Sequence, residues 1–438
     1  MSAAFGGLRA VAARFGYSAL LRLATPLYAL RVLWRGRREP LYARHFGERF
    51  GSFDAAATTG AVWVHAVSLG ETRAAAPLIE AMRAARPGLR LLLTHGTATG
   101  RAAGQALLRA GDAQAWLPFD TPGGARRFLR HFRPAAGVLI ETEIWPNVLA
   151  EARRAGVPMF LANARLSVRS RRRGARVDAL LRPAFASLAA AFAQSAGDAE
   201  RLRAAGVGDV VVAGNLKYDM APDEALLARG RNWKTSLQRG VVLAASTREG
   251  EEAMLLAQWR ALPAPRPLLV VVPRHPQRFD AVAELVAAAG FSLSRRSAWT
   301  GGTPPLEAAS AEVWLGDSML EMPAWYALAD SALLGGSFAP LGGQNLIEAA
   351  ACGCPVVMGP HTFNFGEAAA LSLAAGAAIR VTGMAAGVIA AAALVRGDAQ
   401  AERERRAAAA LAWSQAHRGA ATHMAAAIVA ALAAQTVE

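Results

Sequence analysis

Lysine is nearly absent from this chain of 438 residues, in which Lys217 and Lys234 are the only two. Arginine therefore supplies almost all of the positive charge, and the net charge is +15. A basic balance suits anionic partners such as phosphorylated substrates, anionic lipid or nucleic acid. Because the chain has no arginine–aromatic ladder and no zinc-finger spacing, we expect no nucleic-acid partner. A lysine that persists among so many arginines indicates a position that needs a compact ammonium group.

Cysteine and the usual metal motifs are also scarce. Cys352 and Cys354 are separated by one residue, which indicates small buried side chains and no disulfide framework. No Asp-any-Asp triplet occurs, and the Glu141–Glu143 triplet, which could in principle hold a metal, lies in the other half of the chain from the glycine stretch described below. A dinucleotide fingerprint, a P-loop lysine and a metalloprotease helix are missing as well. We therefore expect neither a metal nor a resident cofactor.

Long apolar runs are limited to one marginal segment, residues 15–34, where Arg22 and Arg31 interrupt the apolar residues. A clean membrane-spanning helix needs about 20 mainly apolar residues. The segment could be a tilted anchor, an amphipathic helix in an anionic membrane surface, or a buried helix of a soluble domain. The arginines that follow at 35–38 predict that the rest of the protein stays on the cytoplasmic side.

From residue 62 onward, short apolar strands alternate with amphipathic helical stretches, which predicts βαβ units and parallel sheets. The predicted strands of the first half are 62–65, 91–94, 137–140, 159–162 and 210–213. Those of the second half are 241–244, 267–272, the region near 313, 331–334 and 355–358. The fold class is α/β, with two Rossmann-like domains facing a cleft. The predicted segments are an anchor (1–38), a first domain (39–216), a second domain (217–400) and a helical tail (401–438).

The stretch 335–350 has the strongest functional pattern in the second half. A buried strand is followed by two glycine pairs and then by the start of a helix near Gln344. Glycine lets the backbone approach a bound group, and a helix start offers N–H donors to an anion. Glu348, one turn into the helix, could accept the hydroxyl hydrogens of a ribose. This pattern predicts a cradle for a nucleotide or nucleotide-sugar, although a strand-to-helix turn with a capping acid is the simpler alternative.

Polar residues follow the strands of the first half at the edge where open α/β sheets bind ligands. Glu71 lies in a strand-to-helix turn and could act as a general base towards a hydroxyl. The helix dipole lowers the pKa of such an acid, so a useful base needs an apolar or anionic neighbourhood. A purely stabilising acid at the helix start is the alternative. Thr97, the pair Glu141 and Glu143, and the basic loop that begins at Arg165 complete this edge, where capping, ion pairing and solvation are equally good explanations.

Three further loops of the second half follow predicted strands. Ser246 and Arg248 follow one predicted strand, Pro273 and Arg274 follow the next, and residues 315–322 follow a third. Together with the glycine stretch they predict an anion-binding rim built from arginine, hydroxyls and helix termini. One phosphate, as in a nucleoside monophosphate leaving group, needs no metal clamp.

These motifs together resemble the transferases of 3-deoxy-D-manno-octulosonic acid (Kdo) in lipopolysaccharide assembly, a glycosyltransferase family of GT-B fold. The resemblance runs from the N-terminal segment to about Phe365. It is strongest at 65–71, 141–147, 214–219, 273–279 and 335–348, and continues through 358–365. It implies inverting transfer of Kdo from CMP-Kdo to the lipid A precursor (lipid IVA) by an enzyme attached to the cytoplasmic face of the inner membrane.

The resemblance also implies roles for particular residues. Glu71 would be the general base. CMP would bind at Pro273, Arg274, Met319, Leu320, Glu321, Asn345, Leu346, Ile347 and Glu348. The donor side and its phosphate would be lined by Lys217, Ser246, Arg248, Gly342 and Gly343. The acceptor would meet Ser68, Gly70, Thr97, Glu141, Glu143 and Arg165.

Two other functions are consistent with the same patterns. One is a GT-B transferase or epimerase of envelope assembly that uses a UDP-sugar, and comparison of CMP with UDP in a thermal-shift assay would separate the two. The other is a catalytically silent relative that scaffolds envelope enzymes, which the acid at position 71 argues against.

Overall fold

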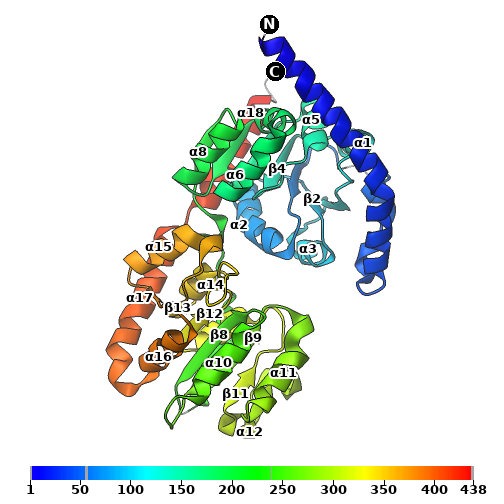
Figure 1. Ribbon diagram of the computed structural model, residues 1–438. Helices are drawn as coiled ribbons and strands as arrows, with labels where there is room; N and C mark the ends of the chain where they lie inside the picture. The colour runs from blue at the N-terminus through cyan, green and yellow to red at the C-terminus, as the bar shows by residue number, and fades with distance from the viewer. Residues whose placement is uncertain (1, 55–57, 238, 436–438) are drawn as a thin grey trace. The chain divides into compact units, whose positions relative to one another are not determined.

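The computed structural model describes residues 2–54, 58–237 and 239–435. The chain forms two compact units, residues 1–220 with 418–438 and residues 221–417 (Figure 1). Each unit is an α/β layer structure with a parallel sheet of seven strands between helices. The predicted α/β class and the pairing of two Rossmann-like domains are confirmed.

The sheet of the first unit has the order β3-β2-β1-β4-β5-β6-β7, and all its neighbours pair in parallel. The chain therefore winds outward from β1 on one side, then returns to β4 and winds outward on the other. The gap between the ends of β1 and β4 is the switch point at which such sheets bind ligands. The strands are β1 (Val62–His65), β2 (Leu91–His95), β3 (Ala113–Trp116), β4 (Ala136–Ile140), β5 (Met159–Ala164), β6 (Ala190–Ala193) and β7 (Val210–Val212).

The helices of the first unit cover both faces of this sheet. The α-helices are α1 (Ser2–Gly36), α2 (Leu69–Ala85), α3 (Ala98–Gly104), α4 (Pro122–Phe132), α5 (Pro146–Arg154), α6 (Val168–Gly174), α7 (Asp178–Ala186), α8 (Ala196–Ala205) and α18 (Ala420–Gln435). The 3₁₀ helices are η1 (Pro40–Tyr42), η2 (Phe46–Phe50), η3 (Gln105–Leu107), η4 (Ala175–Val177) and η5 (Leu216–Tyr218).

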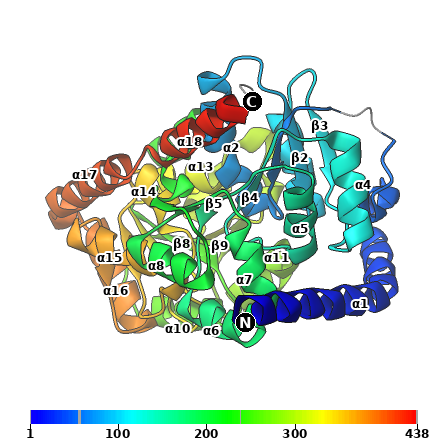
Figure 2. The same cartoon turned by 90° about the horizontal axis from the view of Figure 1, so that it is seen from above.

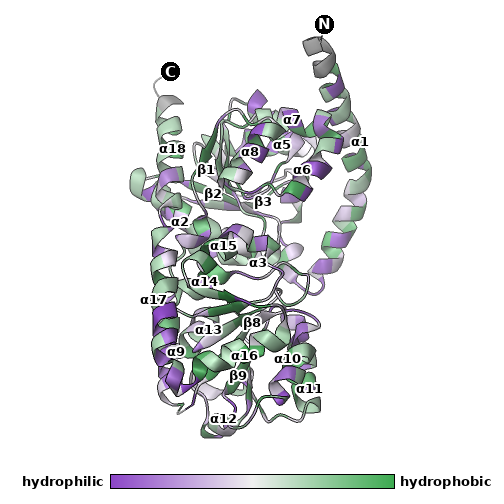
Figure 3. Cartoon of the chain, turned by 60° about the vertical axis from the view of Figure 1, so that its left-hand side comes forward, coloured by the Kyte–Doolittle hydropathy of each residue, from purple (hydrophilic) through white to green (hydrophobic). Residues whose placement is uncertain are grey.

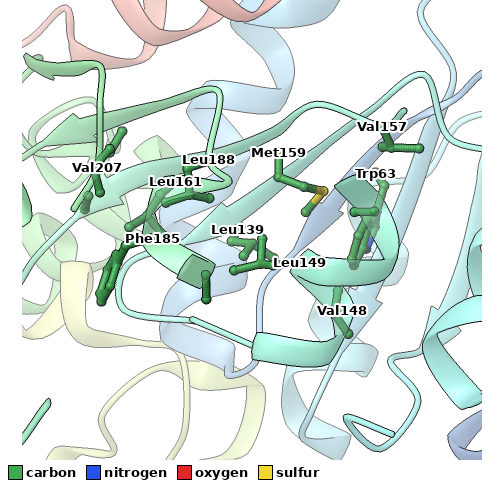
Figure 4. Close-up of a cluster of buried hydrophobic side chains, with 14 of the residues drawn as sticks. Trp63, Leu139, Val148, Leu149, Val157, Met159, Leu161, Phe185, Leu188 and Val207 are labelled. Carbon is green, nitrogen blue, oxygen red and sulfur yellow. The ribbon is translucent and has the colours of Figure 1, made fainter. Parts of the chain in front are cut away.

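One hydrophobic core of the first unit lies on the sheet face that α4, α5 and α7 cover. Leu139 of β4 and Leu149 of α5 are fully buried in it, as are Trp63 and Met159 (Figure 4). Side chains of a parallel strand alternate between faces, and both faces are covered here, so the strands are continuously apolar. This buried core fixes the carboxyl ends of β1 and β4, where the candidate site lies.

The sheet of the second unit has the order β10-β11-β9-β8-β12-β13-β14 and is also parallel throughout. Its switch point lies between β8 and β12. The strands are β8 (Val241–Thr247), β9 (Leu268–Pro273), β10 (Leu293–Arg295), β11 (Val313–Leu315), β12 (Ser331–Leu334), β13 (Val356–Met358) and β14 (Ala378–Arg380).

The helices of the second unit again flank the sheet. The α-helices are α9 (Glu224–Thr235), α10 (Glu251–Arg260), α11 (Phe279–Ala288), α12 (Leu306–Ser310), α13 (Met322–Leu328), α14 (Leu346–Ala351), α15 (Gly366–Ala374), α16 (Met384–Val395) and α17 (Gln400–Ala416). The 3₁₀ helices are η6 (Pro276–Arg278), η7 (Arg296–Ala298), η8 (Thr300–Gly302), η9 (Phe363–Phe365) and η10 (Gly397–Ala399).

Helix α1 packs against α5 and α7 of the first unit along only part of its surface. The hydroxyl of its buried Ser18 donates to the amide oxygen of Asn147 at 3.0 Å, and the Tyr17 hydroxyl donates to the Asp120 carboxylate at 2.9 Å. Large apolar side chains, among them Leu23 and Leu27, remain exposed, and polar residues interrupt them (Figure 3). Within the described residues, no helix combines the length and the apolar character that crossing a membrane requires.

The segment 401–438, which the sequence pattern presents as one helical tail, forms two helices that belong to different units. Helix α17 packs against α14 and α16 of the second unit. Helix α18 returns to the first unit and lies beside α2 (Figure 2), with Met424 and Ile428 fully buried. Asp219 anchors this return, because its carboxylate accepts from the N–H groups of Gly419 and Ala421.

All ten predicted strands are present, with bounds that differ by a few residues. Four further strands were not predicted: β3, β6, β10 and β14. Of these, β3, β6 and β14 contain alanine, which is uncommon in strands, and β10 and β14 have three residues each at or near a sheet edge.

Candidate active site

Glu71 lies at the switch point of the first sheet, in the first turn of α2. Its carboxylate accepts from the N–H of Val67 at 2.7 Å and from the hydroxyl of Ser68 at 3.1 Å, and Ser68 accepts the Glu71 N–H in return. This reciprocal pair is a capping box, so Glu71 does stabilise the helix start. Burial nevertheless raises its pKa, and the charge of Glu141 adds to this rise, whereas the hydrogen bonds from Val67 and Ser68 lower the pKa. The apolar and anionic neighbourhood that a general base needs is therefore present.

Glu141 and Glu143 follow β4, the strand next to β1, and bring two more carboxylates to the same edge. Burial and the charge of Glu71 raise the pKa of Glu143 to about 7. Glu141 pairs with Lys217, whose Nζ lies 2.9 Å from its Oε1. Lys217 thus offsets the charge of one of three neighbouring carboxylates, those of Glu71, Glu141 and Glu143.

Lys217 belongs to the first unit, in η5, although the sequence pattern groups it with the second domain and the donor side. Arg165 is held near the same place, because its N–H donates to the Glu141 carbonyl at 3.4 Å. The Thr97 hydroxyl donates to the Val67 carbonyl at 3.0 Å and caps α3. Ser68, Thr97, Glu141, Glu143 and Arg165 therefore gather around Glu71, with the exposed Gly70 in the same turn.

Two buried histidines, His65 and His95, lie at the ends of the strands that precede the Glu71 and Thr97 loops. Burial lowers the pKa of His65 to about 3 and that of His95 to about 4, so both are neutral at physiological pH. Nδ1 of His95 lies 2.9 Å from the Ala66 carbonyl, and Gln114 donates to its Nε2 at 3.0 Å. These contacts assign the Nδ1–H tautomer to His95 and fix the backbone just before Val67.

In the second unit, the glycine stretch after β12 folds back on itself. The N–H of Gly343 donates to the Gly336 carbonyl at 2.8 Å, and both glycines have positive φ. Gly342 also has positive φ, and a Cβ there would lie 2.4 Å from the Asn364 amide nitrogen. Glycine is therefore required by the backbone at this position.

A buried carboxylate that the sequence pattern did not single out organises this loop. Glu251, at the start of α10, accepts from the N–H groups of Gly336, Phe338 and Ala339 at 2.7 to 3.3 Å and from that of Arg248 at 2.9 Å. It thereby joins the loops that follow β8 and β12, on the two sides of the switch point. A glutamate four residues beyond the strand-end hydroxyl Thr247 was the available signal, but three of its four partners lie 85 to 88 residues away in the chain.

Arginines gather beside this loop. Burial lowers the pKa of His275, and the charges of Arg248, Arg274 and Arg278 add to the shift. Arg278 makes a bidentate pair with the buried Glu252 at 2.6 and 3.0 Å. Among the described residues, the guanidinium groups of Arg248 and Arg274 have no hydrogen-bond or ion-pair partner, which leaves both for an anion. Ser246, with a φ of 56°, and Pro273 lie at the strand ends that carry them.

The predicted CMP-binding residues after β12 lie at the start of α14. Asn345 is the N-cap of this helix, and Leu346 and Ile347 are buried. Glu348 is in the first turn of this helix. In the loop after β11, Met319 and Leu320 are about half exposed, and Leu320 has a φ of 67°. The Glu321 carboxylate is already bound by Arg229 at 2.9 Å, by Arg296 at 2.7 Å and by Ser318, so it orders the loop from within.

No group of three or more His, Cys, Asp or Glu side chains in the described part of the chain is arranged to hold a metal ion.

Comparison with known proteins decides the family. Residues 44–220 match the family model described as 3-deoxy-D-manno-octulosonic-acid transferase (kdotransferase). The chain is 47% identical over 419 residues to a 3-deoxy-D-manno-octulosonic acid transferase of Bordetella pertussis, and the match covers 92% of this chain and 96% of that protein. The chain belongs to the Kdo transferase family. Its Haemophilus influenzae relative of the same name is 34% identical over 362 residues, which cover 81% of this chain and 84% of the relative.

Solved structures agree on the fold. The UDP-GlcNAc 2-epimerase from Neisseria meningitidis aligns over 85% of this chain and 99% of its own, with a TM-score of 0.56 and 14% identity. A glycosyltransferase from Rickettsia africae ESF-5 aligns over 85% and 98%, with a TM-score of 0.56 and 11% identity. At these identities the likeness concerns the fold alone, which is the two-domain GT-B type. The chain is thus a glycosyltransferase, a Kdo transferase of lipopolysaccharide biosynthesis.

Proposed function

We propose that this Kdo transferase uses CMP-Kdo as its donor and the lipid A precursor lipid IVA as its acceptor, with inversion at the transferred carbon. Membership of the Kdo transferase family carries the proposal. The arrangement of residues within each unit supports it. The first unit has a cluster of carboxylates, and the second has two arginines beside a glycine loop whose guanidinium groups have no partner in the described part of the chain.

Glu71 is the general base of the proposed reaction. It takes the proton from the acceptor hydroxyl as that oxygen forms a bond to the anomeric carbon of Kdo, and the bond between this carbon and the CMP phosphate oxygen breaks. Its raised pKa makes the carboxylate a stronger base than a solvated glutamate. The hydrogen bonds from Val67 and Ser68 hold its orientation.

The second unit holds the donor in this proposal. Arg248 and Arg274 neutralise the phosphate of CMP and stabilise the charge that develops on the leaving group. Asn345, the backbone at Leu346 and Ile347, and Glu348 bind the nucleoside. Gly342 and Gly343 let the backbone approach it closely. Pro273, Met319, Leu320 and the backbone at Glu321 complete the site.

We further propose attachment to the cytoplasmic face of the inner membrane through α1. The supporting observation is the set of exposed apolar side chains on this helix, with Leu23 78% and Leu27 70% exposed. Flanking arginines such as Arg35 and Arg38 suit an anionic lipid surface.

Mass spectrometry of lipid IVA incubated with CMP-Kdo and the full-length protein tests the proposed function. We expect product that is heavier than the acceptor by one or more Kdo residues, and the mass gives their number. An acceptor of unchanged mass, or equal turnover when a UDP-sugar replaces CMP-Kdo, would contradict the proposal.

A further inference from the structure

Asn163, the penultimate residue of β5, is a fully buried polar residue that the proposed reaction leaves without a role. Its φ is 53°, and the pairing of β5 with β6 is irregular between Leu161 and Ala164. Its Oδ1 accepts the N–H of Leu216 at 3.1 Å, whereas its Nδ2 is buried and has no partner in the described chain. An unsatisfied buried donor lowers stability, so folding alone does not account for an asparagine here.

Asn163 belongs to a network of three amide side chains at the carboxyl edge of the first unit's sheet. Gln194, just after β6, donates its Nε2 to the Asn163 carbonyl at 2.9 Å, and its Oε1 accepts the Asn215 Nδ2 at 3.2 Å. Asn215 in turn caps η5, because its Oδ1 accepts the N–H of Lys217 at 3.0 Å. Amide oxygens of this network therefore hold the backbone N–H groups of two successive residues, Leu216 and Lys217.

The same end of β5 also holds the acid that pairs with Lys217. The Ala162 carbonyl accepts the N–H of Glu141 at 2.9 Å, and Glu141 has a φ of 63°. Ala162 thus holds the backbone of the acid, and the next residue, Asn163, holds the short helix that carries the lysine. The Nζ of Lys217 lies 2.9 Å from Oε1 of Glu141. Adjacent residues of one strand therefore fix both members of the ion pair.

Other charged and titratable groups surround this ion pair. Glu71 of α2 and Glu143 after β4 lie at the same edge, where burial raises the pKa of both and the charge of Glu141 adds to the rise. The remaining groups on the surrounding elements are the neutral His65 and His95, Arg165, Asp219, and the exposed Arg73 and His423. Lys217 is thus paired with the acid whose charge acts on Glu71.

We propose that Asn163, Gln194 and Asn215 are positioning residues for the reaction, because they hold Lys217 against Glu141 and thereby set the negative charge beside Glu71. The amides carry no charge themselves, so they act only through the position of Lys217. The inference rests on the proposed function and deepens it, since it names the groups that set the strength of the general base.

Chemical labelling of lysine in the full-length protein tests the network without relying on activity. Lys217 and Lys234 are the chain's two lysines, and Lys234 pairs with Asp330 in the second unit, so it is an internal reference. Acetic anhydride should label Lys217 about 3- to 10-fold faster, relative to Lys234, in Asn163→Gly and in Asn215→Ala than in the wild type. The reason is that a nearby carboxylate favours the charged, unreactive form of an amine. Glycine adopts the positive φ of position 163 without strain. Peptide mass spectrometry measures the ratio, and an unchanged ratio in both variants would overturn the inference.

The pH profile of kcat/KM for Kdo transfer tests the consequence for Glu71. When the charge of Glu141 is less well offset, the pKa of Glu71 rises further, and the base must be deprotonated to act. In Asn163→Gly, kcat/KM at the acidic end of the profile should therefore fall about 2- to 10-fold relative to the plateau. In the Lys217→Met background the same change should have no further effect, since the amides act through this lysine. Additive effects, or an unmoved acid limb in variants whose Lys217 labelling has changed, would contradict the proposed role.

Ser195→Ala is the matched control. Ser195 follows Gln194 and caps α8 by accepting the Asp198 N–H at 3.1 Å, so its loss lowers the melting temperature without touching the network. It should change neither the labelling ratio nor the acid limb. Asn215→Ser keeps a capping oxygen and should recover part of the effect of Asn215→Ala. Absence of Kdo transfer by the wild type would contradict the proposed function, whereas the labelling ratio would still decide whether the amides hold Lys217.

Discussion

Burial and the charge of Glu141 raise the pKa of Glu71, the proposed general base. Replacing Glu141 by a neutral residue therefore lowers the pKa of Glu71. The base must be deprotonated to act, and the acid limb of the pH profile of kcat/KM therefore moves to lower pH in Glu141→Gln. Lys217→Met leaves Glu141 unbalanced and should move the limb to higher pH, because Lys217 pairs with it. Shifts of both variants in the same direction would contradict this electrostatic coupling.

A second residue-scale prediction concerns Glu251. Its carboxylate accepts from four backbone N–H groups, whereas glutamine offers a single acceptor oxygen and turns an NH₂ towards donors. We expect Glu251→Gln to lower the free energy of unfolding by about 1–3 kcal/mol, the effect of an unsatisfied buried group, and to weaken CMP binding. Urea denaturation and calorimetric titration with CMP measure the two effects. Glu249→Gln, an exposed neighbour, should change neither.

At the scale of elements, the docking of α1 depends on a few buried polar contacts. The Tyr17 hydroxyl donates to Asp120, which lies 3% exposed beside the start of α5. Tyr17→Phe removes one hydrogen-bond donor from the buried Asp120 carboxylate. We therefore expect the first unit to lose about 1–3 kcal/mol of stability and α1 to become more sensitive to protease. Arg22→Gln, at an exposed position on the same helix, should leave both properties unchanged. A fully protected α1 in Tyr17→Phe would show that apolar packing alone holds the helix.

The elements also show how far the sequence predicts this structure. Val62–His65 was predicted because valine and tryptophan favour strands, and Ser331–Leu334 was predicted because a short apolar run lies between helical patterns. The strand Ala190–Ala193 was missed since alanine has no strand preference and burial between β5 and β7 decides its state. In the site, the strand-end loops were predicted from composition. Glu251 was not, because its burial and its partners 85 to 88 residues away in the chain give it its importance.

At the scale of the whole molecule, the net charge of +15 and the exposed apolar face of α1 predict binding to anionic membranes. We expect the protein to sediment with vesicles of anionic phospholipid and to be partly released by salt. The double variant Leu23→Glu with Leu27→Glu should reduce bound protein about tenfold, since each change places a charge on the apolar face. Leu306→Glu, at a position 92% exposed on α12 of the second unit, is the matched control and should bind as the wild type does.

The central claim is that a Kdo transferase of this family removes the acceptor proton with Glu71. Single-turnover transfer by Glu71→Gln, measured by the mass of the lipid product, tests it most directly. Glutamine retains an acceptor for the Val67 N–H, so we expect an intact fold and unchanged CMP-Kdo affinity. The rate of transfer should fall by about 10²- to 10⁴-fold, the usual contribution of a general base. A variant that folds, binds the donor and transfers Kdo at the wild-type rate would contradict the account.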